Sequence, residues 1–284
     1  MSAAVRDIRL DLGHVELAAR VHGPDDGLPV LALHGWLDNA DSFLRLAPHL
    51  PRLRLVALDL AGHGHSSHRP AGAGYALADY AHDVLRAADR LGWQRFALLG
   101  HSLGAVIAVQ LAGAMPERIS HLGLIDGVLP PTGAEQDAAQ RLGMALQARM
   151  RLEHKRKTVY PRLEDGVAAR MNGRVAVSRE AAEILARRGL EPVPGGHAWR
   201  SDPRLTLPSP VRLTEGQALS FVRAVACPTC LVVAAQGMLA QHRALLDQLP
   251  FEQVALPGGH HLHLNDEHGA ALVADCINRF LGFS

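Results

Sequence analysis

The sequence predicts an α/β fold, in which a mostly parallel β-sheet is covered by helices on both faces and is interrupted by a helical insertion. Two observations predict it. Short, continuously apolar runs alternate with stretches of helical periodicity, as expected for strands buried on both sides. The alternation stops after residue 126 and resumes near residue 225, with no strand pattern between them. Repeated strand–helix units of this kind build a parallel sheet.

The expected sheet begins with a hairpin. Residues 8–12 and 15–21 have a period near two on either side of Gly13, which favours antiparallel strands. Buried strands are then expected at residues 30–33, 53–60, 96–99, 122–125, 229–235 and 253–256. Helices are expected at residues 43–50 with Asp41 as N-cap, at 75–91, after the segment 100–104 as far as Met115 and Pro116, and at 242–249 and 270–280.

The chain is predicted to consist of two structural parts. Residues 1–126 and 225–284 form the core that contains the sheet, and residues 127–224 form a helical cap inserted between two strands. Within the insertion we expect helices at residues 136–156, 179–188 and 214–225, and a loop at the Pro- and Gly-rich residues 192–210.

Composition narrows the classes of function. The chain has 284 residues, 48% of them hydrophobic, and a formal net charge of +1 at pH 7. A charge so close to zero does not favour nucleic acid or an anionic membrane as partner. No apolar run approaches the roughly 18 residues of a membrane span, and the N-terminal residues lack a signal-peptide core. Three cysteines do not suggest a disulfide framework, so we expect a cytoplasmic protein, as monomer or homodimer.

Chemically suggestive side chains follow five of the predicted strands. They are Trp36, Asp59, Ser102, Asp126 and His260. In open parallel sheets, ligands bind at the carboxyl ends of the strands. These side chains are therefore predicted to share one site.

Ser102 lies in the sequence Gly-His-Ser-Leu-Gly, residues 100–104, between an apolar strand and an apolar helix. This G-x-S-x-G pattern is typical of a nucleophile elbow, a strained turn that lifts the serine hydroxyl above the sheet. Gly100 and Gly104 let other segments approach closely, and the helix N-terminus directs N–H groups at the reacting carbonyl. Ser102 is the predicted nucleophile, against the alternative that the segment is only a tight turn.

A serine hydroxyl needs a general base, because it is a weak nucleophile at neutral pH. The end of a late strand supplies three candidates, His260, His261 and His263. The residues alone do not choose among them.

Four motifs carry a resemblance to a known family. They are Leu33-His34-Gly35-Trp36-Leu37-Asp38-Asn39 and the segments at residues 58–70, 100–104 and 259–265. Through them the chain resembles the α/β-hydrolase superfamily along essentially its whole length, and within it the serine hydrolase-like proteins. The resemblance implies an α/β-hydrolase fold with a helical cap, a small-molecule acyl substrate, no cofactor and no metal.

The resemblance also implies roles for individual residues. It selects His260 as the base, because the family's base follows a glycine and precedes a second histidine by three residues, here His263; His261 is the alternative. It implies an oxyanion hole formed by the main-chain N–H groups of Trp36 and Leu103. The substrate pocket that it implies is lined by His34, Gly35, Trp36 and His101.

The third member of the triad is displaced. Most family members place an aspartate after the strand that follows the insertion, where this chain has Gly237. Some relatives take the acid from the end of the preceding strand, which here is Asp126. Asp126 is therefore predicted to orient His260 and to stabilise its imidazolium form. The alternative is that Asp126 only caps the end of a strand.

Two further patterns have simpler interpretations. The histidines within residues 63–68, with His260, suggest a metal site, but they belong to the family's own loop motif and lack suitably spaced carboxylate or cysteine partners. Cys227 and Cys230 have C-x-x-C spacing, but the segment enters a strand instead of opening a helix, so we expect core residues.

The predicted function is a serine hydrolase, with a carboxylic ester as the expected bond. A serine at the elbow argues against the halide-displacing and epoxide-opening reactions of the superfamily, which need a carboxylate nucleophile. The alternative is a binding protein with little turnover, which the glycine at position 237 leaves open. The acyl group, the leaving group and the choice among ester, thioester and amide stay open.

Overall fold

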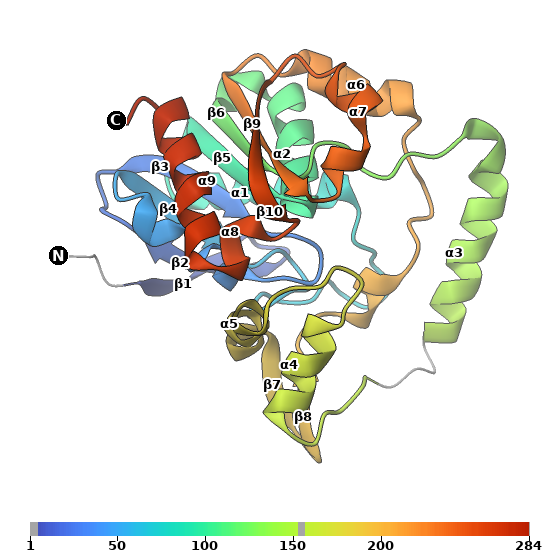
Figure 1. Cartoon of the computed structure of the whole chain (residues 1–284). Coiled ribbons are helices and arrows are strands. Elements are labelled where there is room, and N and C mark those ends of the chain that lie inside the picture. The colour runs from blue at the N-terminus through green and yellow to red at the C-terminus, as the bar shows by residue number, and fades with distance from the viewer. Residues whose placement is uncertain (1–4, 153–156, 284) are drawn as a thin grey trace.

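A computed structural model describes residues 5–152 and 157–283. Eight strands form one sheet in the order β1-β2-β4-β3-β5-β6-β9-β10. Only the β1–β2 and β2–β4 pairs are antiparallel, and every other pair is parallel. This topology confirms the predicted α/β class (Figure 1). The strands are β1 (Arg6–Asp11), β2 (Glu16–His22), β3 (Leu28–Leu33), β4 (Leu53–Leu58), β5 (Phe96–His101), β6 (Ile119–Ile125), β9 (Thr229–Gln236) and β10 (Glu252–Gly259).

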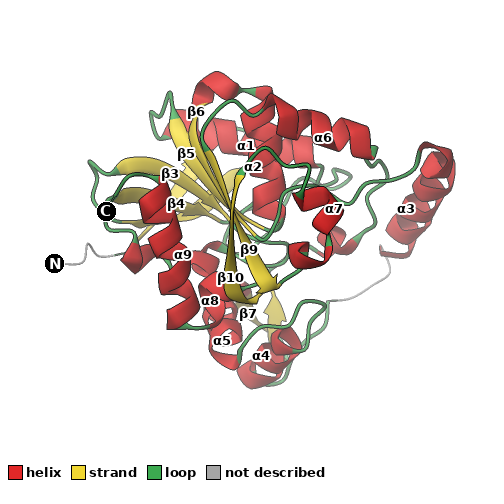
Figure 2. Ribbon diagram, turned by 45° about the horizontal axis from the view of Figure 1, so that its top comes forward, coloured by secondary structure: helices red, strands yellow, loops and turns green. Residues whose placement is uncertain are grey.

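Helices cover both faces of this sheet. Because side chains alternate along a strand, Leu31 and Leu33 of β3 pack into one hydrophobic cluster, and Val30 and Ala32 pack into another. The first cluster includes residues of α1 (Leu77–Arg90), α2 (Leu103–Ala114) and α6 (Glu215–Ala224), and the second includes residues of α9 (Glu267–Phe280). Figure 2 shows α9 on the side of the sheet opposite to α1 and α2.

Two of the expected core helices are shorter than predicted. Residues 43–50 form two separate 3₁₀ turns, Ala40–Phe43 and Ala47–His49, because Pro48 has no N–H to continue a helix. The N-cap of the first turn is Asn39, whose side chain accepts the N–H of Asp41, so the prediction of Asp41 as N-cap was wrong. Near the C-terminus, the helix expected at 242–249 is the single turn α7 (Arg243–Leu246).

The inserted segment, residues 127–224, lies between β6 and β9, which are neighbours in the sheet. It contains α3 (Ala138–Leu152), α4 (Leu163–Met171), α5 (Arg179–Gly189), the hairpin β7 (Leu190–Val193) and β8 (Gly196–Trp199), and α6. The hairpin corrects the prediction of a loop at 192–210, and α4 was not predicted. The expected helix at 136–156 runs past α3 into residues 153–156, which lie outside the described residues.

The elements of the inserted segment occupy two places in Figure 1. Helices α4 and α5 and the β7–β8 hairpin lie below the sheet, next to the ends of its strands, whereas α3 projects to the right. Helix α6 instead packs against α2, where the carbonyl of Phe221 is so close to Gly113 that a Cβ there would lie 2.5 Å from it.

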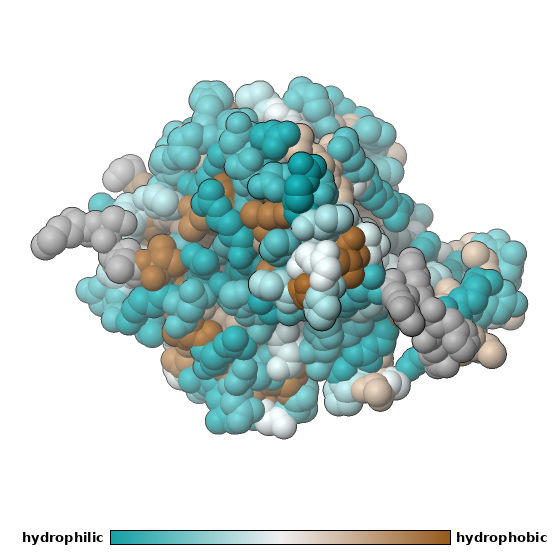
Figure 3. Space-filling view, turned by 90° about the horizontal axis from the view of Figure 1, so that it is seen from below, coloured by the Kyte–Doolittle hydropathy of each residue, from teal (hydrophilic) through white to brown (hydrophobic). Residues whose placement is uncertain are grey.

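The surface seen in Figure 3 is mostly hydrophilic, with apolar patches that are small and separate. None of the helices in residues 5–152 and 157–283 has both the length and the apolar composition that crossing a membrane requires.

Candidate active site

Ser102 is the single residue between β5 and α2. Its backbone has φ 51° and ψ −112°, a combination that L-residues rarely adopt. The flanking glycines permit it, because a Cβ at Gly104 would run into the carbonyl of Leu33 and one at Gly100 would lie 2.5 Å from the nitrogen of Ala105. A strained residue held by such close packing is the backbone geometry of a nucleophile elbow.

His260 follows β10, and its ring meets Asp126, which follows β6. The distance from His260 Nδ1 to Asp126 Oδ2 is 2.6 Å, and both side chains are buried. Because an ionised carboxylate can only accept, the ring donates through Nδ1, which leaves Nε2 as the acceptor nitrogen of the neutral imidazole. The structure therefore brings the predicted base and the predicted acid together.

The predicted nucleophile is next to this pair along the sheet. The N–H of Ser102 donates to the carbonyl of Ile125, the residue before Asp126, at 3.1 Å. Within the described residues no hydrogen bond joins Ser102 Oγ to His260. Such bonds are often long in the absence of substrate and tighten when it binds.

Gly237 and Asp126 fit each other. A Cβ at Gly237 would lie 2.6 Å from Cγ of Asp126 and closer still to its Oδ2, so the Asp126 carboxylate fills the space beside the glycine. The N–H of Met238 donates to that carboxylate at 2.8 Å. The glycine at the family's usual acid position is thus the feature that lets Asp126 lie there.

The two predicted oxyanion-hole donors have free main-chain N–H groups. Leu103 is the first residue of α2, where an N–H has no intrahelical acceptor. Within residues 5–152 and 157–283, neither this group nor the N–H of Trp36 donates to a protein acceptor. Trp36 is 39% exposed as a residue, and its indole Nε1 donates to the carbonyl of Leu205 at 2.9 Å. The assignment of both N–H groups to an oxyanion hole stays a prediction.

His34 and His101 are completely buried. The Nδ1 of His34 donates to the Gly35 carbonyl at 2.7 Å and its Nε2 accepts the N–H of Leu60 at 3.0 Å, and burial lowers its pKa to about 4. The Nε2 of His101 donates to the carbonyl of His260 at 2.9 Å. The prediction that these two side chains line a substrate pocket conflicts with their burial. Gly35 is buried too, and a Cβ there would lie 2.9 Å from His101 Nδ1.

His261, the alternative base, contacts a different carboxylate. Its Nε2 lies 3.0 Å from Asp38 Oδ2, and Arg170 of α4 donates to Asp38 Oδ1 at 2.7 Å. Asp38 belongs to one of the four motifs, but no sequence pattern singled out Arg170 as its partner.

Asp38, His101 and His261 are also candidate metal ligands, with donor atoms within 4.8 Å of one another. The Arg170 guanidinium already provides a cation at this carboxylate, which makes the group a poor metal site. A second candidate group consists of His14, His82 and Asp83. It is a poor metal site for the same reason, because the Arg69 guanidinium donates to Asp83 at 2.5 Å. The histidines of residues 63–68 belong to neither group. The absence of a metal cofactor stays a prediction.

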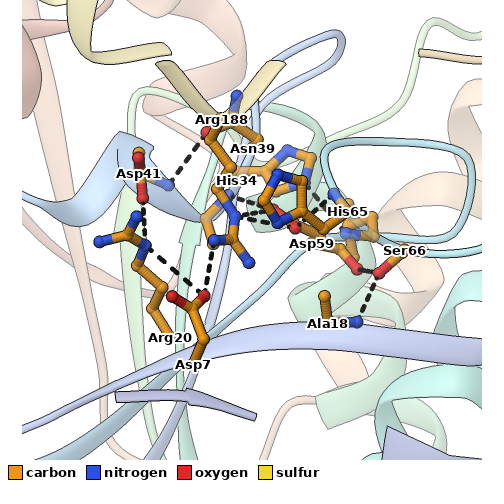
Figure 4. A network of polar contacts seen from close by, with 12 residues as sticks. Asp7, Ala18, Arg20, His34, Asn39, Asp41, Asp59, His65, Ser66 and Arg188 are labelled. Carbon is orange, nitrogen blue, oxygen red and sulfur yellow. Dashed lines mark hydrogen bonds and ion pairs between the residues drawn. The ribbon is translucent and has the colours of Figure 1, made fainter. Parts of the chain in front are cut away.

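Asp59, the remaining side chain at a strand end, belongs to a polar network that we call the anchor cluster (Figure 4). Arg188 of α5 contacts Asp59 with Nε at 2.9 Å from Oδ2, and its Nη1 donates to Asp7 at 2.7 Å. The N–H groups of Ala40 and His65 donate to the same Asp59 carboxylate at 2.7 and 2.8 Å. Arg20 and Asp41 complete the cluster. It joins the inserted segment to the core, and Asp59 does not contact the Ser102 site.

Comparisons with known proteins identify the family of the fold. A model of the α/β hydrolase fold family matches residues 29–164. A serine hydrolase-like protein of Danio rerio is 32% identical, over 96% of this chain and 88% of that protein. The crystal structure of a hypothetical protein from Pseudomonas aeruginosa PAO1 is 62% identical, with a TM-score of 0.95 over 97% of this chain and 99% of that one.

A thioesterase domain from the curacin biosynthetic pathway is 27% identical, with a TM-score of 0.83 over 97% of this chain and 99% of the domain. The fold, the family match and the Danio rerio relative lead to one conclusion: the chain belongs to the α/β-hydrolase superfamily and is similar to its serine hydrolase-like proteins.

Proposed function

We propose that the protein is a serine hydrolase that cleaves an acyl substrate, with Ser102 as nucleophile, His260 as general base and Asp126 as the acid that orients it. The observation that carries the proposal is the 2.6 Å contact between His260 Nδ1 and Asp126 Oδ2, next to a strained serine at the junction of β5 and α2. It also weighs against the binding-protein alternative, whose support was the missing acid at Gly237.

Each group has a defined task in the reaction. Asp126 holds the proton on Nδ1, so Nε2 of His260 takes the Ser102 proton as the hydroxyl attacks the carbonyl. The N–H groups of Trp36 and Leu103 stabilise the oxyanion, each by about 3 kcal/mol if they act like the donors measured in other hydrolases. The imidazolium then protonates the leaving group, and water releases the acid by the same steps.

The inserted segment, residues 127–224, acts in this proposal as a cap over the site. Its support is that α4, α5 and the hairpin lie by the strand ends in Figure 1 and that Leu205 accepts a hydrogen bond from Trp36. A cap in this place would control access and would select the acyl group.

A carboxylic ester is the proposed bond. A thioester is the second candidate, favoured by the 27% identity to a thioesterase domain over nearly the whole of both chains. Both bonds present a carbonyl to the same nucleophile. The test measures kcat/KM of the same enzyme for p-nitrophenyl esters and for acyl thioesters with the same acyl chains. The series with the higher kcat/KM identifies the preferred bond.

A fluorophosphonate probe tests the nucleophile directly. Folded wild-type protein should be labelled at Ser102, and Ser102→Ala should not be labelled. Folded wild-type protein that stays unlabelled, or equal labelling of the variant, would contradict the proposed function.

A further inference from the structure

The turn that holds His260 is fixed by side chains from two other parts of the chain. The carbonyl of His260 accepts a hydrogen bond from Nε2 of His101, the residue directly before the predicted nucleophile. The next residue, His261, has its ring against Asp38. The base is therefore positioned through its main chain as well as through the contact of its ring with Asp126.

The second contact leads to the inserted segment. His261 Nε2 donates to Asp38 Oδ2 at 3.0 Å, because an ionised carboxylate can only accept. Arg170 of α4 donates through Nη2 to Asp38 Oδ1 at 2.7 Å, and its Nη1 donates to the carbonyl of Val175 at 2.9 Å. The side chains are 5%, 0% and 12% exposed for His261, Asp38 and Arg170.

The buried negative charge of Asp38 depends on the side chains that contact it. Burial by itself raises the pKa of Asp38, but the nearby His261 and Arg170 outweigh it and hold that pKa well below its usual range. Asp38 is therefore an anion that needs the guanidinium. Removing one partner of such a buried pair leaves an uncompensated charge, and the groups around it rearrange.

We infer that Arg170, acting through Asp38 and His261, is a positioning residue for the general base and couples helix α4 to the reactivity of Ser102. This inference rests on the proposed function. Arg170 touches none of the reacting groups and acts on the backbone of the turn. A displacement of about 1 Å in a catalytic group costs on the order of 100-fold in rate, so its loss should be visible in kcat.

The test compares Arg170→Gln with Arg162→Gln. Arg162 lies at the N-cap of the same helix and pairs with Asp165 at the surface, so it is a matched control. Arg170→Gln should lower kcat and the rate of fluorophosphonate labelling about 10- to 100-fold, with KM changed less than about 3-fold. Arg170→Lys should restore part of the loss, because it returns the charge without the two-pronged geometry.

The pH profile adds a readout that general loosening of the fold would not give. The titratable and charged groups in contact with residues 260–261 are Asp126, Asp38, Arg170, His101 and His263. Without Arg170, Asp38 loses its guanidinium partner, which adds net negative charge beside the imidazole rings of His261 and His260. The acid limb of kcat/KM should therefore move to higher pH in Arg170→Gln and stay in place in Arg162→Gln.

The outcomes separate the two proposals. Wild type labelled at Ser102 with kcat and acid limb unchanged in Arg170→Gln would overturn the link and leave the hydrolase assignment intact. If folded wild type is not labelled, the proposed function fails, and the link is judged by NMR. The signal of the proton between His260 and Asp126, identified by its loss in Asp126→Asn, should shift or broaden in Arg170→Gln; an unchanged signal would overturn the link.

Discussion

Two of the buried polar clusters that connect the inserted segment to the core are each built around an arginine of that segment and an aspartate of a core loop. In the anchor cluster Arg188 contacts Asp59, and in the second, which we call the base cluster, Arg170 contacts Asp38. The base cluster also contains Asp126, His101, His260 and His261.

The two clusters differ in the other groups that the aspartate carboxylate contacts. Asp59 accepts two main-chain N–H groups besides Arg188, so its contacts fix loops of the backbone. Asp38 contacts a histidine next to the predicted base. In the proposed function, the Arg188–Asp59 pair therefore serves stability and the Arg170–Asp38 pair serves the geometry of the reaction. Changes in the anchor cluster should lower the free energy of unfolding, whereas changes in the base cluster should lower kcat.

The largest effect is expected for Asp126→Asn in the base cluster. The amide keeps the shape but no longer holds the His260 proton on Nδ1, so kcat should fall about 10³- to 10⁴-fold with little change in Tm. Steady-state kinetics and thermal melting measure both. An unchanged kcat would remove Asp126 from the proposed triad.

Arg188→Met tests the anchor cluster, where a loss of stability is expected without a loss of kcat. The methionine leaves Asp59 buried without its cation, which should cost about 3–5 kcal/mol of unfolding free energy in urea titrations. The folded fraction should keep the wild-type kcat per labelled Ser102. The control is Arg179→Met on the same helix, where an exposed pair with Glu183 should be worth less than about 1 kcal/mol. Equal losses of unfolding free energy in the two variants would contradict the larger cost expected for removing the buried arginine.

Local patterns made most of the fold and part of the site predictable. Ser102 and His260 stand in short motifs at strand ends, and the strands themselves are continuous apolar runs. Asp126 was predicted as the acid because Gly237 stands where the resemblance leads one to expect an aspartate, and Asp126 ends the preceding strand.

The two arginines could not be predicted, for a physical reason. Arg170 and Arg188 lie 132 and 129 residues from Asp38 and Asp59, and the inserted segment has many arginines with the same local surroundings. Which of them is buried depends on how α4 and α5 pack, and no periodicity encodes that. The β7–β8 hairpin was missed for a related reason, since Pro192 lies in a strand that pairs with a single partner.

Gly237→Ala should act on the base cluster alone. The new Cβ would occupy the space of the Asp126 carboxylate and displace it from His260, so kcat should fall about 100-fold. Gly216→Ala in α6 is the control, because a Cβ there meets nothing within 4 Å. Retained kcat in Gly237→Ala would mean that the carboxylate relocates without loss of function.

The smallest effect expected of a single substitution is on the pH dependence of stability. Burial lowers the pKa of His263 and His63 to about 3 and that of His34 to about 4, from an ordinary value of 6.5. The unfolded chain therefore takes up protons below pH 6.5 that the folded chain does not. Stability is full above pH 6.5 and is lost as the pH falls toward 4, by about 2 kcal/mol per histidine at pH 5.

Asp41 of the anchor cluster contributes with the opposite sign. Burial raises the pKa of Asp41 from 3.8 to about 6, so between these values the folded chain binds the extra proton and gains stability as the pH falls. Urea titrations at pH 7.5 and 5.0 measure the sum. His263→Gln should flatten the loss and Asp41→Asn should steepen it, whereas His242→Gln, at an exposed site, should leave it unchanged. A steeper loss in His263→Gln would contradict the sign assigned to the buried histidine.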